Sequence, residues 1–357
     1  SLGIVTARSG INMSGGQLLV GSGVTIGVAG IATFRTGRVD VGDALSNTSI
    51  GEQAGDAHTT GSQNVAIGYQ ALTANTTALR SVAVGVYALS SNTTAVNNTA
   101  LGYAALKENT TGATNTALGN YALNVNTTGT NNIAVGYAVL DANTTGDGNT
   151  GLGMDALSAN TTADDNTAVG RRAMYANTTG TQNVAVGGFA LSANTTSSNN
   201  TAVGYYALKD STGGNNSALG RTALQQNTTG TNNTGLGYQA LTANTTGGGS
   251  VAVGSNALAT QTTGSENTAV GYEALKLATG SDADYNTAVG SEALKATTDG
   301  DRNVAVGWRA LTSNTTGEKN TAIGIESLYT STTADNNTAV GRRALYSSTT
   351  GSNVTAV

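Results

Sequence analysis

An aliphatic residue followed by glycine recurs along this chain at a nearly constant spacing. Eighteen such glycines occur, and of the 17 intervals between them 15 are of 17 residues, one is of 16 and one is of 19. Self-similarity at a fixed short period is typical of repeat architectures. The spacing therefore predicts a solenoid, and it overrides the two or three globular domains that a length of 357 residues would suggest. These marker glycines are Gly51, Gly68, Gly85, Gly102, Gly119, Gly136, Gly153, Gly170, Gly187, Gly204, Gly220, Gly237, Gly254, Gly271, Gly290, Gly307, Gly324 and Gly341.

Positions within one repeat are numbered relative to the marker glycine, which is position 0, so that one unit runs from −6 to +10. From −4 onward the consensus is Asn-Thr-Ala-Val-Gly-Tyr-x-Ala-Leu-x-x-Asn-Thr-Thr-Gly. Asn fills −4 in 16 of 18 units, Ala fills −2 in 15, and −1 is Val, Ile or Leu in all 18. Ala at +3 and Leu at +4 each fill 16. The recurring apolar positions are therefore few and fixed.

This pattern predicts an all-β coil. Positions −4 to +1 alternate as a strand does, with −3 and −1 on one face and Asn, Ala and Gly on the other. A second short strand around Ala-Leu at +3 and +4 would close the coil. Asn-Thr-Thr-Gly would form the turn, because Asn tolerates left-handed conformations and Gly supplies positive φ. Too many Gly, Asn and β-branched residues occur for a helix.

Stacked coils place each residue above its counterpart, so identical side chains form ladders. With strands about 4.8 Å apart, eighteen coils would give a rod of roughly 85 Å. Stacked Asn side chains can bond amide to amide. The absence of proline suits this arrangement, because every backbone N–H must donate to a neighbouring coil.

The core of one coil is expected to be thin. Burying a Val or Leu contributes roughly 1.5–3 kcal/mol, whereas ordering each backbone residue costs about 1–2 kcal/mol. Leu at +4 and the aliphatic residue at −1 are the only sizeable apolar residues that recur. We therefore expect three parallel chains to share a core, approaching through the small Asn, Ala and Gly face.

Composition excludes several classes of function. Charged residues make up 10% of the chain and the net charge is −5, which speaks against nucleic-acid binding. No stretch reaches the 18 apolar residues of a membrane helix, so we expect no membrane insertion. The first residues show no basic n-region followed by an apolar h-region, so we expect no secretory signal. With no cysteine, the redox compartment cannot be inferred.

The chain divides into two parts. Residues 1–46 do not follow the repeat and are predicted to be a β-rich adaptor or the start of a fibre, with strands in the stretch from Gly23 to Phe34. Residues 47–357 form the predicted solenoid. Thr355-Ala356-Val357 fills positions −3 to −1, so the sequence stops in mid-coil. Because solenoids usually end in atypical capping repeats, we expect a fragment of a longer fibre.

The repeat resembles the head repeats of trimeric autotransporter adhesins, whose shorter units carry a Ser-Val-Ala-Ile-Gly-like core. The units closest to that core are Asn64-Val65-Ala66-Ile67-Gly68, Ser81-Val82-Ala83-Val84-Gly85 and Ser250-Val251-Ala252-Val253-Gly254. The resemblance covers residues 47–357 and implies a left-handed β-roll in a homotrimer. The repeat is also similar to arrays in bacteriophage tail fibres. The longer unit, and the expectation of neither a signal peptide nor an anchor barrel, favour the phage fibre.

The leading hypothesis is a structural shaft of a phage tail, located in the virion and involved in host attachment without catalysis. Other tail or fibre proteins, and a host glycan or protein, would be its partners. The alternative is the head of a surface adhesin on a bacterial cell. A third hypothesis is an ice-binding solenoid, which the turn location of the Thr pair at +8 and +9 disfavours.

No residue pattern points to catalysis, a cofactor or a metal. The only histidine, His58, occupies the Asn column at +7, and we interpret it as a turn residue. Acidic turns at Asp147, Asp164-Asp165, Asp282 with Asp284, and Asp299 with Asp301 lack the Gly-Gly-x-Gly-x-Asp repeat of calcium-binding solenoids. Eleven Asn-Thr-Thr tripeptides match the N-glycosylation pattern, but turns and ladders explain them without modification.

Candidate surface-binding residues come from two features. Aromatic residues recur at +1, where they could stack on sugars or simply cover the thin core, and we favour packing. The 19-residue unit carries two extra residues between Leu277 and Tyr285, and such insertions map to surface loops. The candidates are Tyr69, Tyr103, Tyr137, Tyr205, Tyr238, Tyr272 and Trp308 from the aromatic column, and Asp282, Asp284 and Tyr285 from the insertion.

Overall fold

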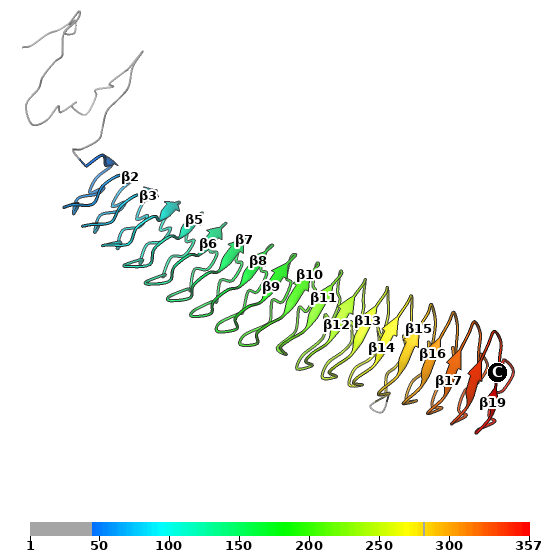
Figure 1. Cartoon of the computed structure of the whole chain (residues 1–357). Helices are drawn as coiled ribbons and strands as arrows, with labels where there is room; N and C mark the ends of the chain where they lie inside the picture. The colour runs from blue at the N-terminus through cyan, green and yellow to red at the C-terminus, as the bar shows by residue number, and fades with distance from the viewer. Residues whose placement is uncertain (1–44, 281–282) are drawn as a thin grey trace, which may run out of the picture. The chain divides into compact units, whose positions relative to one another are not determined.

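The computed structural model describes residues 45–280 and 283–357, which belong to a single compact unit. These residues form an all-β parallel solenoid in which coils of about 17 residues stack along one axis (Figure 1). The predicted fold class is confirmed. The described residues contain no helix that is long and apolar enough to cross a membrane. All but residues 45 and 46 of the predicted N-terminal segment, 1–46, lie outside the described part of the chain.

Each coil contributes one short strand. The strands are β1 (Thr48–Ile50), β2 (Val65–Ile67), β3 (Val82–Val84), β4 (Thr99–Leu101), β5 (Thr116–Leu118), β6 (Ile133–Val135), β7 (Thr150–Leu152), β8 (Thr167–Val169), β9 (Val184–Val186), β10 (Thr201–Val203), β11 (Ser217–Leu219), β12 (Thr234–Leu236), β13 (Val251–Val253), β14 (Thr268–Val270), β15 (Thr287–Val289), β16 (Val304–Val306), β17 (Thr321–Ile323), β18 (Thr338–Val340) and β19 (Thr355–Ala356). β1 to β18 span positions −3 to −1, within the stretch from −4 to +1 that the alternation predicts, and β19 spans −3 and −2.

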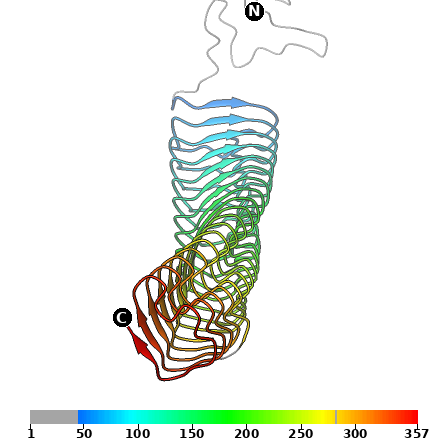
Figure 2. The ribbon, with the colours of Figure 1, turned by 90° about the vertical axis from the view of Figure 1, so that its right-hand side faces the viewer.

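Every strand pairs in parallel with the strand of the next coil, position on position. Thr48 lies opposite Val65 in the first pair, and Thr338 lies opposite Thr355 in the last. The 16-residue and 19-residue intervals do not disturb this register, because Val203 still faces Leu219 and Val270 still faces Val289. Successive coils are rotated slightly about the axis of the stack (Figure 2).

Backbone hydrogen bonds between coils continue outside the strands. Between the coils of Gly153 and Gly170, bonds from residues of the turns include Leu157 N to Ala173 O at 3.1 Å and Thr161 N to Thr178 O at 3.1 Å. Gly170 N donates to Leu152 O at 2.7 Å beside the strand. The whole perimeter of a coil is therefore bonded to its neighbour.

The second strand predicted around Ala-Leu is absent from the described coils. Positions +1 to +6 form consecutive turns instead, and Leu at +4 adopts a left-handed conformation, with φ of 53° at Leu157 and 52° at Leu191. Positions +2 and −5 are left-handed too, as at Tyr121 and Asn131. The Asn-Thr-Thr-Gly segment bends the chain without positive φ, so the residues that turn the coil are not those expected.

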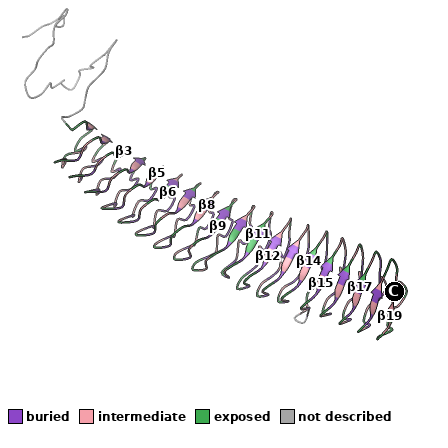
Figure 3. Ribbon diagram, in the orientation of Figure 1, coloured by how far each residue is buried: buried purple, intermediate pink, exposed green. Residues whose placement is uncertain are grey.

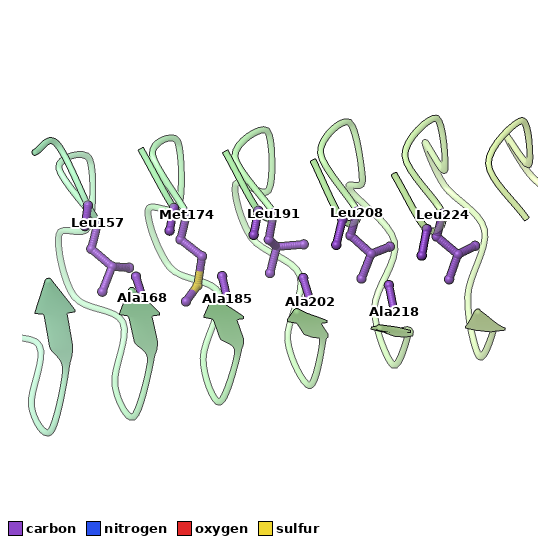
Figure 4. Packing of buried hydrophobic residues seen from close by; sticks show 14 of the residues in the cluster. Leu157, Ala168, Met174, Ala185, Leu191, Ala202, Leu208, Ala218 and Leu224 are labelled. Atoms are coloured by element: carbon purple, nitrogen blue, oxygen red, sulfur yellow. The ribbon is translucent and has the colours of Figure 1, made fainter. Parts of the chain in front are cut away.

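The core lies inside each coil and runs through the stack as a single cluster from Ala54 to Ala339. Figure 4 shows its repeating contact, in which Leu157 at +4 of one coil points toward Ala168 at −2 of the next. Both side chains are fully buried. Ala at +3 completes the apolar set, so neighbouring coils share each buried leucine.

The predicted orientation of the strand faces relative to the core is wrong. Asn at −4 and Ala at −2 are fully buried inside the coil, whereas −3 and −1 point outward and are exposed or half-buried (Figure 3). The aliphatic residue at −1 therefore does not belong to the coil's own core. The interior is filled by the left-handed Leu at +4, which leaves room opposite it only for alanine. The Asn, Ala and Gly face accordingly cannot be where another chain approaches.

Two ladders of buried asparagine run beside the apolar core. Asn183 at −4 donates through Nδ2 to Ser197 O at 2.9 Å, and its Oδ1 accepts the backbone N–H of Asn200 at 2.9 Å. In the +7 column, Asn126 Nδ2 donates to Asn109 Oδ1 at 2.8 Å and to Gly129 O at 3.0 Å. The predicted amide-to-amide ladder is confirmed, and its carboxamides satisfy buried backbone groups.

The marker glycine is required for two separate reasons. Gly187 has φ of +131°, a region that L side chains rarely adopt. A Cβ atom at Gly187 would also lie 2.6 Å from the carbonyl oxygen of Gly204 in the next coil. The adjacent Gly188 lacks both constraints, because a Cβ there would meet only the ring of Tyr205 at 3.3 Å.

We expect Gly187→Ala to destabilise the solenoid by at least about 2 kcal/mol, because strained backbone and a steric clash add together. Gly188→Ala is the matched control and should change stability by less than about 1 kcal/mol. Urea denaturation followed by circular dichroism measures both. Equal midpoints for the two variants would contradict the close-stacking role of the marker position.

Candidate functional surfaces

Function on these coils has to be sought in columns of outward side chains. The described residues form no pocket. They also contain no group of three or more His, Cys, Asp or Glu side chains placed to hold a metal ion. The outward columns include the strand face at −3 and −1, the aromatic and charged columns at +1 and +2, and the turns around −6 and at +9.

The strand face consists of the outward residues at −3 and −1 of β1 to β18. It carries Val, Ile, Leu, Thr and Ser, and no charged residue occupies either position in any coil. Leu101, Leu152 and Leu219 are 49%, 45% and 53% exposed. The sequence reasoning missed this surface because it placed the aliphatic residue of the strand in the core.

A tyrosine ridge crosses five coils near the N-terminal end of the stack. Tyr69, Tyr87, Tyr103, Tyr121 and Tyr137 contact one another in turn, edge to face, with ring centroids 5.3 to 6.1 Å apart. Tyr at +1 of one coil alternates with Tyr at +2 of the next. Edge-to-face contact is a favoured geometry for aromatic pairs. The ridge therefore combines mutual packing of the rings with exposure to solvent, and Tyr137 is 54% exposed.

The remaining aromatic candidates do not join this ridge. Tyr205 packs against Tyr206 and Phe189, forming a separate cluster. Other rings are paired with cations: the guanidinium of Arg221 lies 5.7 Å from the ring centroid of Tyr238, and that of Arg309 lies 4.7 Å from Trp308. Tyr272 is 51% exposed and Tyr285 is 52% exposed. A signal for the ridge was present in the sequence, namely the alternation of Tyr between +1 and +2.

The +2 column toward the C-terminal end carries charges of both signs. Glu292 pairs with Arg309 at 2.8 Å, and Glu326 pairs with Arg343 at 2.6 Å, each between adjacent coils. Glu273 accepts from Lys276 at 2.7 Å and from Lys295 at 2.6 Å. Hydrogen bonds from these two ammonium groups, Lys276 first, hold the pKa of Glu273 at about 2. The Glu273–Lys276 pair lies within one coil, and the other three pairs link neighbouring coils.

The acidic turns have a structural role. Asp147 Oδ1 accepts the backbone N–H of Thr130 at 2.6 Å, and Asp164 Oδ1 accepts that of Asp147 at 2.7 Å. Asp284, in the 19-residue unit, accepts from Ser265 N at 2.6 Å in the same way. These carboxylates therefore bond one coil to the preceding one. The candidate Asp282 lies outside the described residues, and Tyr285 stacks with Arg302, whose guanidinium lies 5.7 Å from the ring centroid.

The eleven Asn-Thr-Thr asparagines are fully buried in the +7 ladder. A glycan on such a side-chain nitrogen is incompatible with the folded coil, because that atom donates inside the stack, as at Asn126. The Thr hydroxyl at +8 is also hydrogen-bonded to the next coil. Thr127 Oγ1 donates to Thr144 O at 3.0 Å, and the same bond recurs along the column. His58 is half-buried at the start of the +7 column.

Comparison with known proteins adds no relative. No protein-family model matches the chain, and no curated protein is significantly similar to it in sequence. What the coils do must therefore be argued from their own geometry.

The pKa of Glu273 gives a pH prediction. Because it lies below the ordinary value of 4.5, the ion pairs contribute stability above about pH 4.5 and lose it as the pH falls toward 2. Glu273→Gln should lower stability at pH 7 by a few tenths to about 1 kcal/mol, the usual range for such pairs. The difference from the unmodified chain should vanish near pH 2.

Thermal denaturation at pH 7 and near pH 2 measures this effect. Glu108→Gln is the matched control, because Glu108 pairs with Lys107 at 2.7 Å but both side chains are more than 40% exposed. The control should change stability less. A constant difference between the Glu273→Gln variant and the unmodified chain at both pH values would contradict the assignment.

Proposed function

We propose that this chain is a shaft segment of a bacteriophage tail fibre, assembled as a parallel homotrimer and working in host attachment by mechanical means rather than by catalysis. The observation that carries the proposal is the uninterrupted ladder from β1 to β19, which keeps its register across both irregular intervals. Such a stack supplies length, because each coil adds about 4.8 Å.

The same ladder supplies stiffness. At least seven backbone hydrogen bonds outside the strand pairing join the coil of Gly153 to that of Gly170. Each contributes about 0.5–1.5 kcal/mol net, and the shared leucines and two asparagine ladders add to them. Bending the stack sharply would break all of these contacts between two adjacent coils at the same time, so the stack resists bending. A rod of this kind can hold a receptor-binding tip away from a particle and transmit force to it.

A shaft built from equivalent coils should tolerate removal of whole coils. Deleting residues 116–183, which comprise four 17-residue units, joins Asn115 to Val184 in the correct register. We expect a folded rod that is shorter by roughly 19 Å, measured by electron microscopy of the purified chain. Deleting residues 116–175 is the control and should disrupt folding, because it breaks the period. Unfolding after the in-register deletion would contradict the shaft proposal.

A second candidate is the head of a bacterial surface adhesin, and the tyrosine ridge favours it. The ridge exposes four rings between 38% and 54% over five coils, and Tyr is common where proteins bind one another or other surfaces. In this role the side of the solenoid would bind a host or matrix surface directly. Aromatic residues farther toward the C-terminal end, such as Tyr238 and Trp308, would contribute less, because arginine side chains already lie over their rings.

Immunogold electron microscopy distinguishes the two candidates. Antibodies raised against residues 47–357 should label the fibres of phage particles from the source culture if the chain is a shaft. Label distributed over the bacterial envelope, with particles unlabelled, would overturn the shaft proposal and support the adhesin head. Pre-immune serum is the control for nonspecific binding to either surface.

A further inference from the structure

The strand face is the largest feature of the described surface that the coils themselves do not explain. Its outward side chains are aliphatic or hydroxylic in all eighteen coils, and those at −1 are Val, Ile or Leu without exception. Ten of these −1 residues are at least 36% exposed, and so are Ile133 and Val184 at −3. Soluble monomers rarely expose an apolar patch of more than a few hundred Å².

The size of the face matches a stable interface. Eighteen strands about 4.8 Å apart, each about 10 Å long, give a strip of roughly 800 Å². A standard protein interface buries about 800 Å² on each partner. The borders of the strip also fit the rim of an interface. The mostly polar −5 column flanks one edge, and the +1 column, in which seven of 18 residues are aromatic, flanks the other.

The partner must match a surface that repeats every 4.8 Å or so over its whole length. A globular protein offers no apolar surface with this period, whereas the same strand face on another solenoid does. The face also carries no charge that an oppositely charged partner could recognise. We infer that the strand face is the surface through which copies of this chain pack together, with their axes parallel.

This inference rests on the proposed homotrimer and changes how it is built. Association through the small Asn, Ala and Gly face is ruled out, because those side chains are buried within one chain. In the trimer the aliphatic residues at −1 form a second core between chains. Each coil then has an inner core of Leu and Ala and contributes to an outer core of Val, Ile and Leu.

The test uses matched charge variants. The triple variant Leu101→Asp, Leu152→Asp and Leu219→Asp puts three carboxylates on the strand face without touching the inner core. Its control adds the same charges elsewhere, at the exposed turn residues Thr111, Thr145 and Thr246. Sedimentation equilibrium at micromolar concentration should give about 106 kDa, three times the 35.3 kDa of one chain, for the unmodified chain and for the control.

The strand-face variant should instead sediment as a folded monomer, with its β-type circular dichroism retained. The mass of the unmodified chain should not fall between 0.1 and 1 M salt, because an apolar interface is not screened. A chain that is already monomeric, or a strand-face variant that keeps the mass of the control, would overturn the inference. A dimer would retain the strand face as the interface but contradict the homotrimer of the proposed function.

Single cysteines give a second readout, since the chain has none of its own. Leu101→Cys and Thr111→Cys lie in the same coil, the first on the strand face and the second on an exposed turn. In a parallel assembly the Leu101→Cys thiols of different chains come together, so mild oxidation should link them and not those of Thr111→Cys. Crosslinking of Thr111→Cys but not of Leu101→Cys would overturn the assignment of the face. That result would leave the shaft proposal standing if deletion of coils still shortens the rod.

Discussion

The structure depends on the close approach of one coil to the next at the marker glycine. There the backbone passes so near the carbonyl of the following coil that a Cβ atom has no room, and φ near +130° adds a second restriction. This contact fixes the axial position of each coil. Once it is fixed, the strand residues, the turn carbonyls and the buried amides of successive coils all fall into register.

The interior of the stack contains an apolar core and two columns of hydrogen-bonded asparagine. Leucine at +4 is shared by adjacent coils and supplies the apolar contact, while the two asparagine columns pair with backbone groups that would otherwise be buried without partners. Serine replaces asparagine at Ser81 and Ser250, where its hydroxyl still accepts the N–H of the next coil, though at 3.4 and 3.3 Å. The ladder therefore requires a hydrogen-bond acceptor at −4, and a hydroxyl group can take the place of the amide there.

The exterior is where the coils differ from one another. The +1 and +2 columns change from a tyrosine ridge near the N-terminal end to ion pairs and cation–π contacts farther along. The strand face, in contrast, is uncharged throughout, with an aliphatic residue at −1 and an aliphatic or hydroxylic residue at −3. A surface that stays constant while its neighbours vary is suited to the pairing with another copy of the chain that we infer, whereas the variable columns are suited to contacts with other molecules.

The sequence by itself determined the period, the strand in each unit and the asparagine ladders, because a 17-residue repeat with alternating residues before glycine allows little else. It did not determine which strand face turns inward. Aliphatic residues at −1 and −3 look like core residues, yet Leu at +4, held in a left-handed conformation such as that of Leu157, occupies the narrow interior and leaves space only for alanine. The contacts along the ridge from Tyr69 to Tyr137 likewise required the stacking of coils, because residues 16 or 18 positions apart become neighbours only in the tertiary structure.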